Sequence, residues 1–379
     1  MTDRRVLKVL HLISGLEAGG AERSLANLVA GLDRARIRNV VVSMTGRGFF
    51  GEVIERRGTP VHALNMTRGV PSAGALWRLR ELLRDERPDL LQTWLYHADC
   101  MGLFAKVFQP GLPLVWNLRC SNMALDSYRP LTRLVRGLLV TGSRVPAAVI
   151  ANSYAGADFH RQLGYAARRW EIIPNGFDPT LWSPDAQARR AVRQALEIPP
   201  DSPVLGLVAR LDPAKDHAGF LRAAQRVHEA LPACRFVLIG QDVPSLAERV
   251  AAHGLGEVTR LLGPRDDIQR ISAAFDVACL SSAFGEAFPN VLGEAMCCGV
   301  PCVATDVGDA ALIVGATGRV VPPRNPHALA AAAIELLRMD PDARQTLGAA
   351  ARARVIAAYS LTTTLGRYTA LYEDLLAVH

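Results

Sequence analysis

The sequence has few cysteines and no pattern that would pair them. Seven cysteines occur among 379 residues, Cys297 and Cys298 are adjacent, and no C-x-x-C spacing is present. An odd number of cysteines without a regular framework argues against a disulfide-stabilised secreted fold and against a structural zinc site. We therefore expect reduced thiols in a cytoplasmic protein.

The sequence also lacks long apolar runs and a secretion signal. The apolar run at residues 6–13 has only the length of a strand, and no run reaches the ~18 apolar residues that span a bilayer. Residues 1–5 are polar and predict no signal peptide. We expect a cytoplasmic protein that is either free or lies peripherally on the inner face of a membrane.

Patterns for a metal ion or a resident cofactor are missing. The only Asp-x-Asp triplet joins Asp340 and Asp342 through a proline, which is typical of a helix start. The glycine loop near the start of the chain has Gly15 followed by Gly19 and Gly20, and this is not the G-x-G-x-x-G of dinucleotide enzymes. We expect no metal and no cofactor, and a nicotinamide oxidoreductase is disfavoured.

Positive charge is concentrated in the first half of the chain. The net charge is +7; residues 1–174 carry 24 Lys/Arg against 14 Asp/Glu, whereas residues 175–379 carry 19 against 22. A basic half can meet nucleic acid, anionic lipid or a phosphorylated substrate. No zinc ligands, aromatic-glycine RNA signature or isolated recognition helix is present, so we expect no nucleic-acid partner. Anionic lipid or a phosphorylated acceptor is favoured.

Two segments leave contact with an anionic membrane open. Residues 76–84 and 128–139 mix leucines with arginines, as interfacial helices do. A helix that packs on a sheet with its arginines outward has the same composition. For residues 76–84, which adjoin Asp85 and Glu86, we favour the packed helix; for residues 128–139 both interpretations stay open.

Apolar strand-like runs alternate with helical patterns along the whole chain. Few aromatics, many small aliphatic residues and this alternation indicate an α/β protein with doubly wound parallel sheets. The length suggests two domains. Residues 174–179, P-N-G-F-D-P, have strong turn chemistry and mark the boundary. We place an N-terminal domain at 1–174 and a C-terminal domain at 175–360.

Two carboxylates stand near the end of the C-terminal domain. An apolar run ends before Glu286, Pro289 then opens a helix that carries Glu294, and the helix stops near Gly299. Ligands of parallel α/β sheets bind at the carboxyl ends of the strands, where this loop lies. Carboxylates accept hydrogen bonds from sugar hydroxyls. For a bare pair of acids, a helix cap and a solvated face would be the simpler interpretation.

Amides and cations near these acids suit an anion. The N–H groups of Asn290, Val291 and Leu292 occupy the first helical turn, where we expect them to lack helical partners. Arg210 and Lys215 lie on a loop that directly follows a predicted strand, so both can reach one diphosphate. Fixed cations at a departing diphosphate lower the barrier to its release.

The stretch F-G-E-A-F-P-N-V-L-G-E-A-M-C-C-G-V-P-C-V-A-T-D around Glu286 and Glu294 resembles the signature of retaining glycosyltransferases of the GT-B, family-four type. The R-L-D-P-A-K-D run, the P-N-G-F-D linker and the early G-G-A-E corner are similar to motifs of the same family. The resemblance implies two Rossmann-like domains that face a central cleft. The N-terminal domain would bind the acceptor, the C-terminal domain the nucleotide sugar, and a last helix at 361–379 would cross back to the first domain.

The resemblance also implies roles for single residues. Glu294 would hold the ribose, Glu286 the transferred sugar, and Arg210 and Lys215 the donor phosphates, with Glu286, Arg210 and Lys215 as the catalytic set. The further donor-binding residues would be Gly19, Gly20, Asn175, Gly176, Arg265, Phe288, Pro289, Asn290, Val291 and Leu292. In the family the base is held partly by backbone, so side chains do not identify it; we expect a UDP-sugar ahead of a GDP-sugar.

Two residues of the N-terminal domain are candidates for the acceptor or sugar pocket. His97 follows a predicted strand and suits proton transfer or a hydrogen bond to a hydroxyl, although capping the next helix is an equal alternative. Arg119 stands where the family often has a histidine. A permanent cation cannot take a proton but can bind phosphate or carboxylate bidentately, so no histidine role is carried over.

These features together predict a retaining, metal-independent transfer of a sugar from a nucleotide-diphospho sugar to a hydroxyl acceptor. The basic first domain favours bacterial polysaccharide or lipid-linked glycan synthesis and leaves a lipid-linked or phosphorylated acceptor open. A nucleotide-sugar epimerase of the same fold and a non-catalytic sugar-nucleotide-binding subunit are the alternatives.

Overall fold

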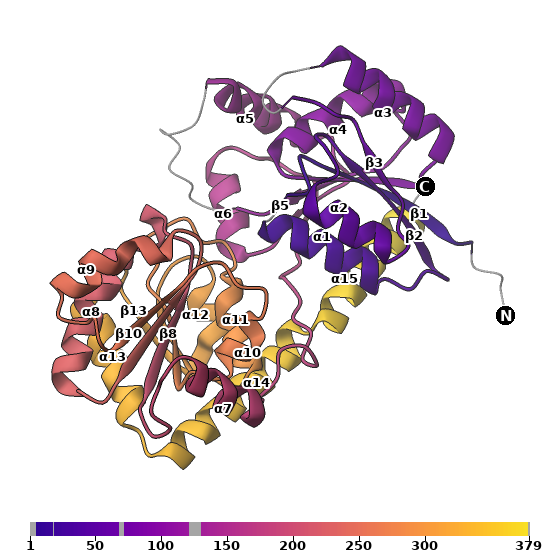
Figure 1. Cartoon of the computed structure of the whole chain (residues 1–379). Coiled ribbons are helices and arrows are strands. Elements are labelled where there is room, and N and C mark those ends of the chain that lie inside the picture. Colours follow the sequence, from indigo (N-terminus) through magenta and orange to yellow (C-terminus); the bar gives the residue numbers. More distant parts are fainter. Residues whose placement is uncertain (1–4, 18, 68–71, 121–129, 378–379) are drawn as a thin grey trace. The chain divides into compact units, whose positions relative to one another are not determined.

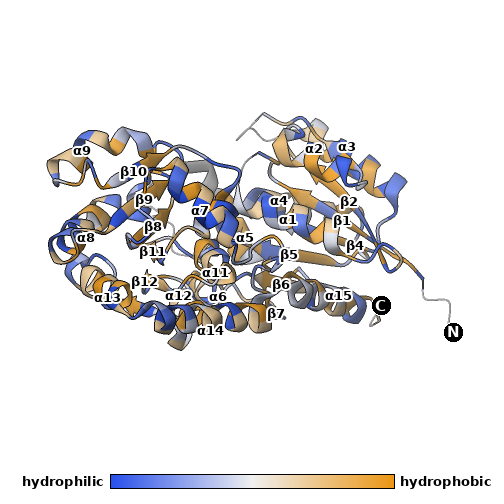
Figure 2. Ribbon diagram, turned by 60° about the horizontal axis from the view of Figure 1, so that its bottom comes forward, coloured by the Kyte–Doolittle hydropathy of each residue, from blue (hydrophilic) through white to orange (hydrophobic). Residues whose placement is uncertain are grey.

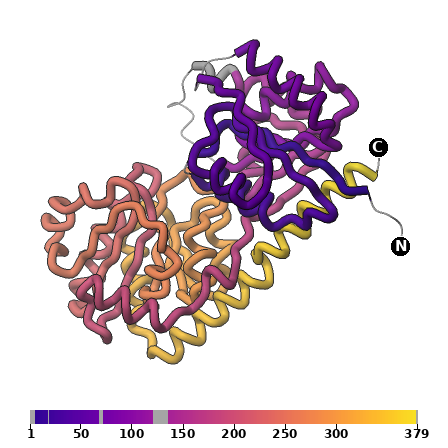
Figure 3. The backbone as a smooth tube through the Cα atoms, turned by 45° about the vertical axis from the view of Figure 1, so that its right-hand side comes forward, coloured from indigo at the N-terminus to yellow at the C-terminus, as the bar shows by residue number. Residues whose placement is uncertain are grey.

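The computed structural model describes residues 5–17, 19–67, 72–120 and 130–377. The chain divides into two compact units, residues 1–176 together with 362–379, and residues 177–361. Figure 3 traces the backbone from indigo to yellow, and the last helix, in yellow, belongs to the first unit. The sequence placed the boundary slightly earlier, between residues 174 and 175.

A seven-stranded parallel sheet forms the N-terminal unit, in the order β3-β2-β1-β4-β5-β6-β7 (Figure 1). Its strands are β1 (Leu7–Ile13), β2 (Ile37–Ser43), β3 (Val61–Ala63), β4 (Leu90–Trp94), β5 (Leu114–Leu118), β6 (Ala148–Ala151) and β7 (Trp170–Ile172). Its helices are α1 (Gly20–Gly31), α2 (Gly48–Arg56), α3 (Ala73–Glu86), α4 (Tyr96–Phe108), α5 (Pro130–Gly142), α6 (Tyr154–Gln162) and α15 (Leu361–Ala377). The strand order reverses between β1 and β4, as in a doubly wound sheet.

The core of this unit includes the C-terminal helix. β1 is buried from Val9 to Ile13, as expected for a central parallel strand that is covered on both faces. Tyr372 of α15 donates its hydroxyl proton to Gln92 Oε1 on β4 at 2.6 Å, and Asn117 Nδ2 on β5 donates to the Tyr368 hydroxyl at 2.8 Å. α15 is therefore an integral part of the N-terminal unit, although it follows the whole C-terminal unit in sequence.

A six-stranded parallel sheet forms the C-terminal unit, in the order β10-β9-β8-β11-β12-β13. Its strands are β8 (Val204–Val208), β9 (Arg235–Ile239), β10 (Thr259–Leu262), β11 (Val277–Leu280), β12 (Cys302–Thr305) and β13 (Arg319–Val321). Its helices are α7 (Ala186–Ala195), α8 (His217–Ala230), α9 (Ala247–Ala252), α10 (Ile268–Ser272), α11 (Asn290–Cys297), α12 (Ala310–Val314), α13 (Pro326–Arg338) and α14 (Pro341–Tyr359), with the short 3-10 turns η2 (Pro213–Lys215), η3 (Val243–Leu246) and η4 (Gly315–Thr317). The predicted doubly wound α/β class is confirmed for both sheets.

The two chain crossings between the units are joined by backbone hydrogen bonds. The N–H of Phe177 donates to the carbonyl of Tyr359 at 2.9 Å, and the N–H of Leu361 donates to the carbonyl of Phe177 at 2.7 Å. The two segments thereby form a short parallel bridge between Phe177 and Ser360. The exit and the return of the chain are thus fixed side by side.

Hydrophobic residues gather on the strands and on the inward helix faces, as the colouring in Figure 2 shows. The sequence patterns predict strands at residues 235–239 and 259–262 and a helix at residues 326–338, and these are the bounds of β9, β10 and α13. The sequence also predicts a helix that begins at Asp266, and α10 begins two residues later and spans Ile268–Ser272. In the part of the chain that the structure describes, no helix combines the length and the apolar character needed to cross a membrane.

Candidate active site

The loops that follow β8 and β11 lie together at the carboxyl edge of the C-terminal sheet. β8 and β11 are parallel neighbours, so their ends meet at one edge. The N–H of Ala283 donates to the carbonyl of Ala214 at 2.7 Å, and the Ser281 hydroxyl donates to the carbonyl of Lys215 at 2.7 Å. These bonds connect the loop that carries Arg210 and Lys215, the predicted phosphate loop, to the loop that carries Glu286, the predicted sugar loop.

Lys215 and Glu286 form the centre of this edge. The Lys215 ammonium Nζ lies 2.5 Å from Glu286 Oε1, and the Ser282 hydroxyl donates to the same oxygen at 2.6 Å. The Lys215 and Glu286 side chains are only 22% and 11% exposed. Charge-assisted hydrogen bonds are strong in such partly buried surroundings, so the carboxylate has a fixed orientation. α11 has Pro289 as its N-cap, and Glu286 is therefore not the cap of that helix.

Arg210 has a different partner from Lys215. Its Nη2 lies 2.9 Å from Asp212 Oδ2, and its side chain is 63% exposed. Asp212 also accepts from the N–H of Ala214 at 2.9 Å. Burial raises the pKa of Asp212, but this amide and the Arg210 guanidinium outweigh it and leave the pKa lowered. The two predicted phosphate-binding cations thus hold separate carboxylates in this structure, and a shared anion would have to attract Arg210 away from Asp212.

The start of α11 corrects one expectation about its amides. Leu292 donates its N–H to the carbonyl of Pro289 at 3.2 Å, so the prediction that it lacks a helical partner is wrong. The reason is a tight i to i+3 turn at the helix start, which satisfies an amide that an ideal α-helix leaves unbonded. Anion binding by the amides of Asn290 and Val291 stays a prediction. Glu294, the second predicted acid, is half-buried on the same helix.

Phe288 packs in the core instead of presenting its ring to a ligand. It is 6% exposed, stacks on Phe177 with ring centroids 6.1 Å apart, and meets the ring of Tyr359 edge to face at 5.3 Å. The Phe177 ring also lies against Gly293 of α11, where an added Cβ would come within 2.2 Å of it. This aromatic stack anchors α11 to the two chain crossings. The donor contact of Phe288 stays a prediction.

Two glycines support the loops by close backbone approach. Gly308 has φ +59°, and a Cβ there would lie 2.6 Å from the carbonyl oxygens of both Glu286 and Ala287. Gly240 has φ +155°, and a Cβ there would lie 2.2 Å from the carbonyl oxygen of Ala209. Side chains do not fit at these positions. The backbone geometry at Glu286 and at the start of the phosphate loop therefore depends on glycine.

Replacing Gly308 with Ala is expected to weaken nucleotide binding by displacing the Glu286 loop. The new methyl group can be accommodated only if the Glu286–Ala287 backbone moves, and φ +59° adds strain for any L-residue. Thermal stabilisation by UDP measures the effect. The control is Gly256→Ala in the same unit, where no atom lies within 4 Å of an added Cβ. Equal stabilisation of the two variants would contradict the supporting role of Gly308.

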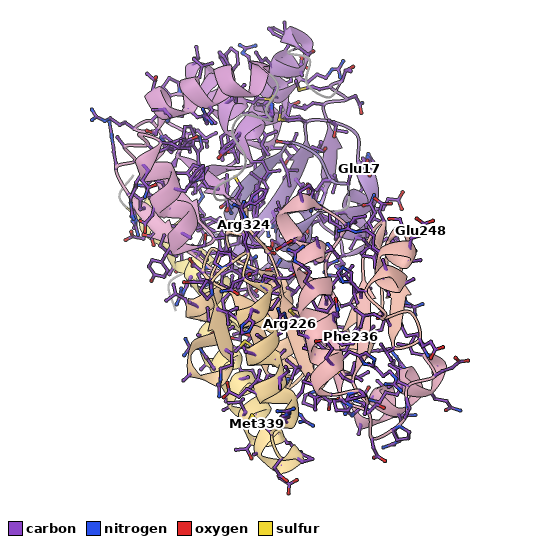
Figure 4. All side chains as sticks on the ribbon, turned by 90° about the vertical axis from the view of Figure 1, so that its left-hand side faces the viewer. Glu17, Arg226, Phe236, Glu248, Arg324 and Met339 are labelled. Atoms are coloured by element: carbon purple, nitrogen blue, oxygen red, sulfur yellow. The ribbon has the colours of Figure 1, made fainter. Side chains whose placement is uncertain are left out.

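Two residues near the edge were not predicted from the sequence. Ser282 donates its hydroxyl proton to Glu286. It is a small polar residue at the end of an apolar run, and its position four residues before Glu286 could have indicated this contact. Arg324 lies in the loop between β13 and α13 (Figure 4). Its guanidinium lies over the Phe284 ring, with Cζ 5.8 Å from the ring centroid. Arg265, a predicted donor residue, pairs with Asp267 at 2.8 Å and is 47% exposed.

The glycine corner of the N-terminal unit contains a carboxylate. α1 begins at Gly20 with Gly19 as its N-cap, and a Cβ on Gly19 would meet the Glu22 carboxylate at 2.2 Å. The Glu22 side chain thus folds back over the start of its own helix. Ala18 lies outside the described residues. Gly19 and Gly20 leave room for this carboxylate, and whether they contact a donor phosphate stays a prediction.

Arg119 occupies a polar cluster in the same unit. Its Nη2 donates to Asn175 Oδ1, and its guanidinium lies over the buried Trp94 ring with Cζ 5.4 Å from the centroid. Burial lowers the pKa of Arg119, whereas Tyr368 and Glu22 raise it. Arg119 therefore connects β5 with the linker, where Gly176 follows Asn175. The acceptor role of Arg119 and the donor roles of the two linker residues stay predictions.

His97 and the two leucine-arginine segments have clear places in the fold. His97 is half-buried in the first turn of α4. In α3, Leu79 and Leu83 are fully buried, so residues 76–84 form the packed helix that we favoured. Of residues 128–139, the first two and the side chains before Val135 lie outside the described part of the chain.

Among the described residues, no group of three or more His, Cys, Asp or Glu side chains could hold a metal ion.

Family models match both units of the chain. The model described as Glycosyltransferase Family 4 matches residues 18–181, and the model described as Glycosyl transferases group 1 matches residues 202–339. The chain belongs to this family of glycosyltransferases. The resemblance that the sequence motifs indicated is thereby confirmed.

Curated relatives are glycosyltransferases as well. The chain is 23% identical over 316 residues to a putative glycosyltransferase, EpsF, of Bacillus subtilis, and the match covers 79% of each chain. It is 31% identical over 274 residues to D-inositol 3-phosphate glycosyltransferase 2 of Catenulispora acidiphila, with 66% of this chain and 62% of that protein covered.

Solved glycosyltransferase structures share the fold. HepE of Anabaena, crystallised in complex with UDP and with UDP-glucose, is 25% identical, with TM-scores of 0.84 and 0.83 and coverage of 97% of this chain and 100% of HepE. Sucrose-phosphate synthase from Thermosynechococcus elongatus gives a TM-score of 0.82 at 20% identity, covering 98% of this chain and 100% of the synthase. The predicted GT-B type, with two Rossmann-like units, is confirmed.

Proposed function

We propose that this glycosyltransferase moves a sugar from a nucleotide-diphospho sugar, with UDP as the first candidate nucleotide, to a hydroxyl acceptor with retention of anomeric configuration and without a metal ion. The C-terminal unit would bind the donor and the basic N-terminal unit the acceptor. The observation that carries the proposal is the Lys215–Glu286 pair beside the start of α11, because it joins a cation for a diphosphate to an acceptor for sugar hydroxyls.

The proposed roles follow from the geometry of this edge. Lys215 can donate three hydrogen bonds and uses one for Glu286, so it can bind a phosphate oxygen while it orients the carboxylate. Arg210 would add a second cation after leaving Asp212, and Glu294 would bind the ribose. Similarity to HepE, whose crystals contain UDP and UDP-glucose, supports a UDP-sugar donor.

Retention is proposed to arise from displacement on one face of the sugar. The Glu286 carboxylate accepts two hydrogen bonds on the same oxygen, which suits a group that orients sugar hydroxyls more than a nucleophile. The departing phosphate would help to deprotonate the acceptor hydroxyl while Lys215 and Arg210 stabilise the negative charge that develops on the diphosphate. In this scheme the cations take the part that a divalent ion has in other transferases.

The donor can be identified from the nucleotide sugar that stabilises the protein against unfolding. A panel of UDP-, GDP- and ADP-sugars is added to the full chain, and the correct donor at a hundred times its dissociation constant should add about 2.7 kcal/mol to the free energy of unfolding. Incubation with hydroxyl acceptors and NMR of the product then report the anomeric configuration, with EDTA present throughout. Loss of activity in EDTA, an inverted product, a new epimer formed without acceptor, or binding without turnover would each contradict the proposal.

The acceptor is proposed to be lipid-linked or phosphorylated, in bacterial polysaccharide or lipid-linked glycan synthesis at the cytoplasmic side of a membrane. The excess of cations in residues 1–174 supports an anionic acceptor. Arg119 is the candidate for binding it, since a guanidinium can bind phosphate bidentately. Arg119→Lys is expected to raise KM for a phosphorylated acceptor more than it changes the affinity for the donor.

A further inference from the structure

Helices α4 and α5 lie side by side in the N-terminal unit. They pack directly on each other (Figure 1). Leu103 of α4 lies so close to Gly142 of α5 that a Cβ added to Gly142 would lie 2.6 Å from Leu103 Cδ1. Leu103 and Val107 are one turn apart on α4. Leu138 lies one turn before Gly142 on α5, and Val145, just after the end of α5, donates its N–H to the Gly142 carbonyl at 2.9 Å. Both residues therefore lie near Leu103 and Val107, and the outward faces of the two helices form one surface.

Large apolar side chains are exposed on this surface. Phe104, Val107 and Phe108 of α4 are 47%, 73% and 41% exposed, and their spacing puts them on one helix face. Leu138 of α5 and Val145 just after it are 46% and 47% exposed. We call these five residues the α4–α5 surface. Single exposed apolar residues are ordinary, but a group of this kind on adjacent helices marks an interaction site.

The segment that carries this surface is almost free of acids. Between residues 100 and 157 the sequence has one acid, Asp126, and the cations Lys106, Arg119, Arg129, Arg133, Arg136 and Arg144. Of these, Arg144 is exposed directly beside Val145. Lys106 donates to the carbonyl of Leu112 at 2.8 Å and so keeps its ammonium at the end of α4, near Phe108. The exposed apolar residues are thus bordered by cations.

We propose that the α4–α5 surface docks on a bilayer that contains anionic phospholipid. Phe, Val and Leu side chains would enter the boundary between headgroups and acyl chains, while the bordering cations would lie at the phosphates, which is the chemistry of interfacial helices. A protein partner would require a complementary acidic and apolar face, whereas an anionic membrane supplies both properties. The surface contains none of the residues to which donor binding or catalysis is assigned at the Lys215–Glu286 edge, so membrane docking stands apart from the transfer proposal.

Vesicle sedimentation of the full chain tests this proposal. The chain should sediment with vesicles of phosphatidylcholine and phosphatidylglycerol and much less with phosphatidylcholine alone. In V107D/L138D, each substitution should weaken binding about tenfold, because a large apolar side chain loses its membrane burial. The matched control is L181D/L312D in the C-terminal unit, whose wild-type side chains are 55% and 48% exposed. That control should bind vesicles as the wild type does.

Three results would overturn the proposal: equal vesicle binding by V107D/L138D and the wild type, equal binding of the wild type to neutral and anionic vesicles, or a dimer in vesicle-free sedimentation that V107D/L138D dissociates. The last outcome would assign the surface to a second copy of the chain. Thermal unfolding and stabilisation by UDP should be the same in all variants, which separates a lost surface from a lost fold. R144Q should weaken binding to anionic vesicles and leave binding to neutral ones unchanged.

Discussion

Lys215→Met should lower kcat by about 10²–10³-fold, the range measured when one preorganised electrostatic group is removed from an active site. Met keeps most of the length of the side chain and removes the charge. The ammonium now holds the Glu286 carboxylate at 2.5 Å and, in the proposed reaction, faces the diphosphate as its charge grows. Since that charge is larger in the transition state than in the bound donor, kcat should fall more than donor affinity.

The control for this substitution is Arg226→Met. Arg226 is an exposed cation on α8 in the same unit (Figure 4). Its loss changes the net charge equally but should leave kcat near the wild-type value. Steady-state kinetics give kcat, and calorimetric titration with UDP gives donor affinity. If Lys215→Met retained kcat within tenfold of Arg226→Met, Lys215 would not stabilise the leaving group.

The fold was largely predictable because burial on both faces of a parallel strand produces apolar runs of strand length. β9 is such a run, buried from Phe236 to Ile239, and its bounds follow from the sequence. Periodicity is less informative where a short helix is set by packing. α10 begins at Ile268 and not at the predicted Asp266, a difference of two residues that its apolar pattern does not resolve.

The sequence predicted where the candidate site lies better than it predicted which side chains pair with each other there. Strand ends locate Lys215 and Glu286 on one edge, since β8 and β11 each precede a loop with charged residues. Which carboxylate each cation holds depends on side-chain reach, and spacing could not separate Lys215–Glu286 from Arg210–Asp212. The packing of the Phe288 ring could not be predicted for a similar reason: its partners Phe177 and Tyr359 are distant in sequence, so the aromatic stack is visible only in three dimensions.

A buried charge network holds α7 to the C-terminal sheet. Asp276, which precedes β11, lies 2.7 Å from Arg189 Nη2 and 2.7 Å from Arg193 Nη2, and it accepts the N–H of Val204 at 2.8 Å. The Asp276 and Arg193 side chains are 8% and 5% exposed. Burial lowers the pKa of Arg193 although the carboxylate of Asp276 opposes this effect. Asp276 is therefore the counter-charge of a guanidinium that water does not reach.

Asp276→Asn should destabilise the protein by about 3–5 kcal/mol, because it leaves the Arg193 charge buried and uncompensated. For a unit of this size the unfolding midpoint should fall by about 10 °C. The control is Glu335→Gln, which removes the partner of Arg319 in a pair whose side chains are 37% and 55% exposed. Exposed pairs of this kind contribute about 0–1 kcal/mol. Thermal unfolding of the full chain compares the two.

The double variant Asp276→Asn/Arg193→Met distinguishes an uncompensated charge from a general packing defect. If the cost of Asp276→Asn arises from the charge left on Arg193, removing that charge as well should recover part of the lost stability. Recovery should be incomplete, because Arg193 also donates to the carbonyls of Ala274, Pro200 and Ser202. These carbonyls would lose their donor in the double variant. The single variant Arg193→Met completes the comparison. If the stability losses of Asp276→Asn and Arg193→Met simply add in the double variant, the two side chains are energetically uncoupled. The destabilisation would then come from the separate hydrogen bonds.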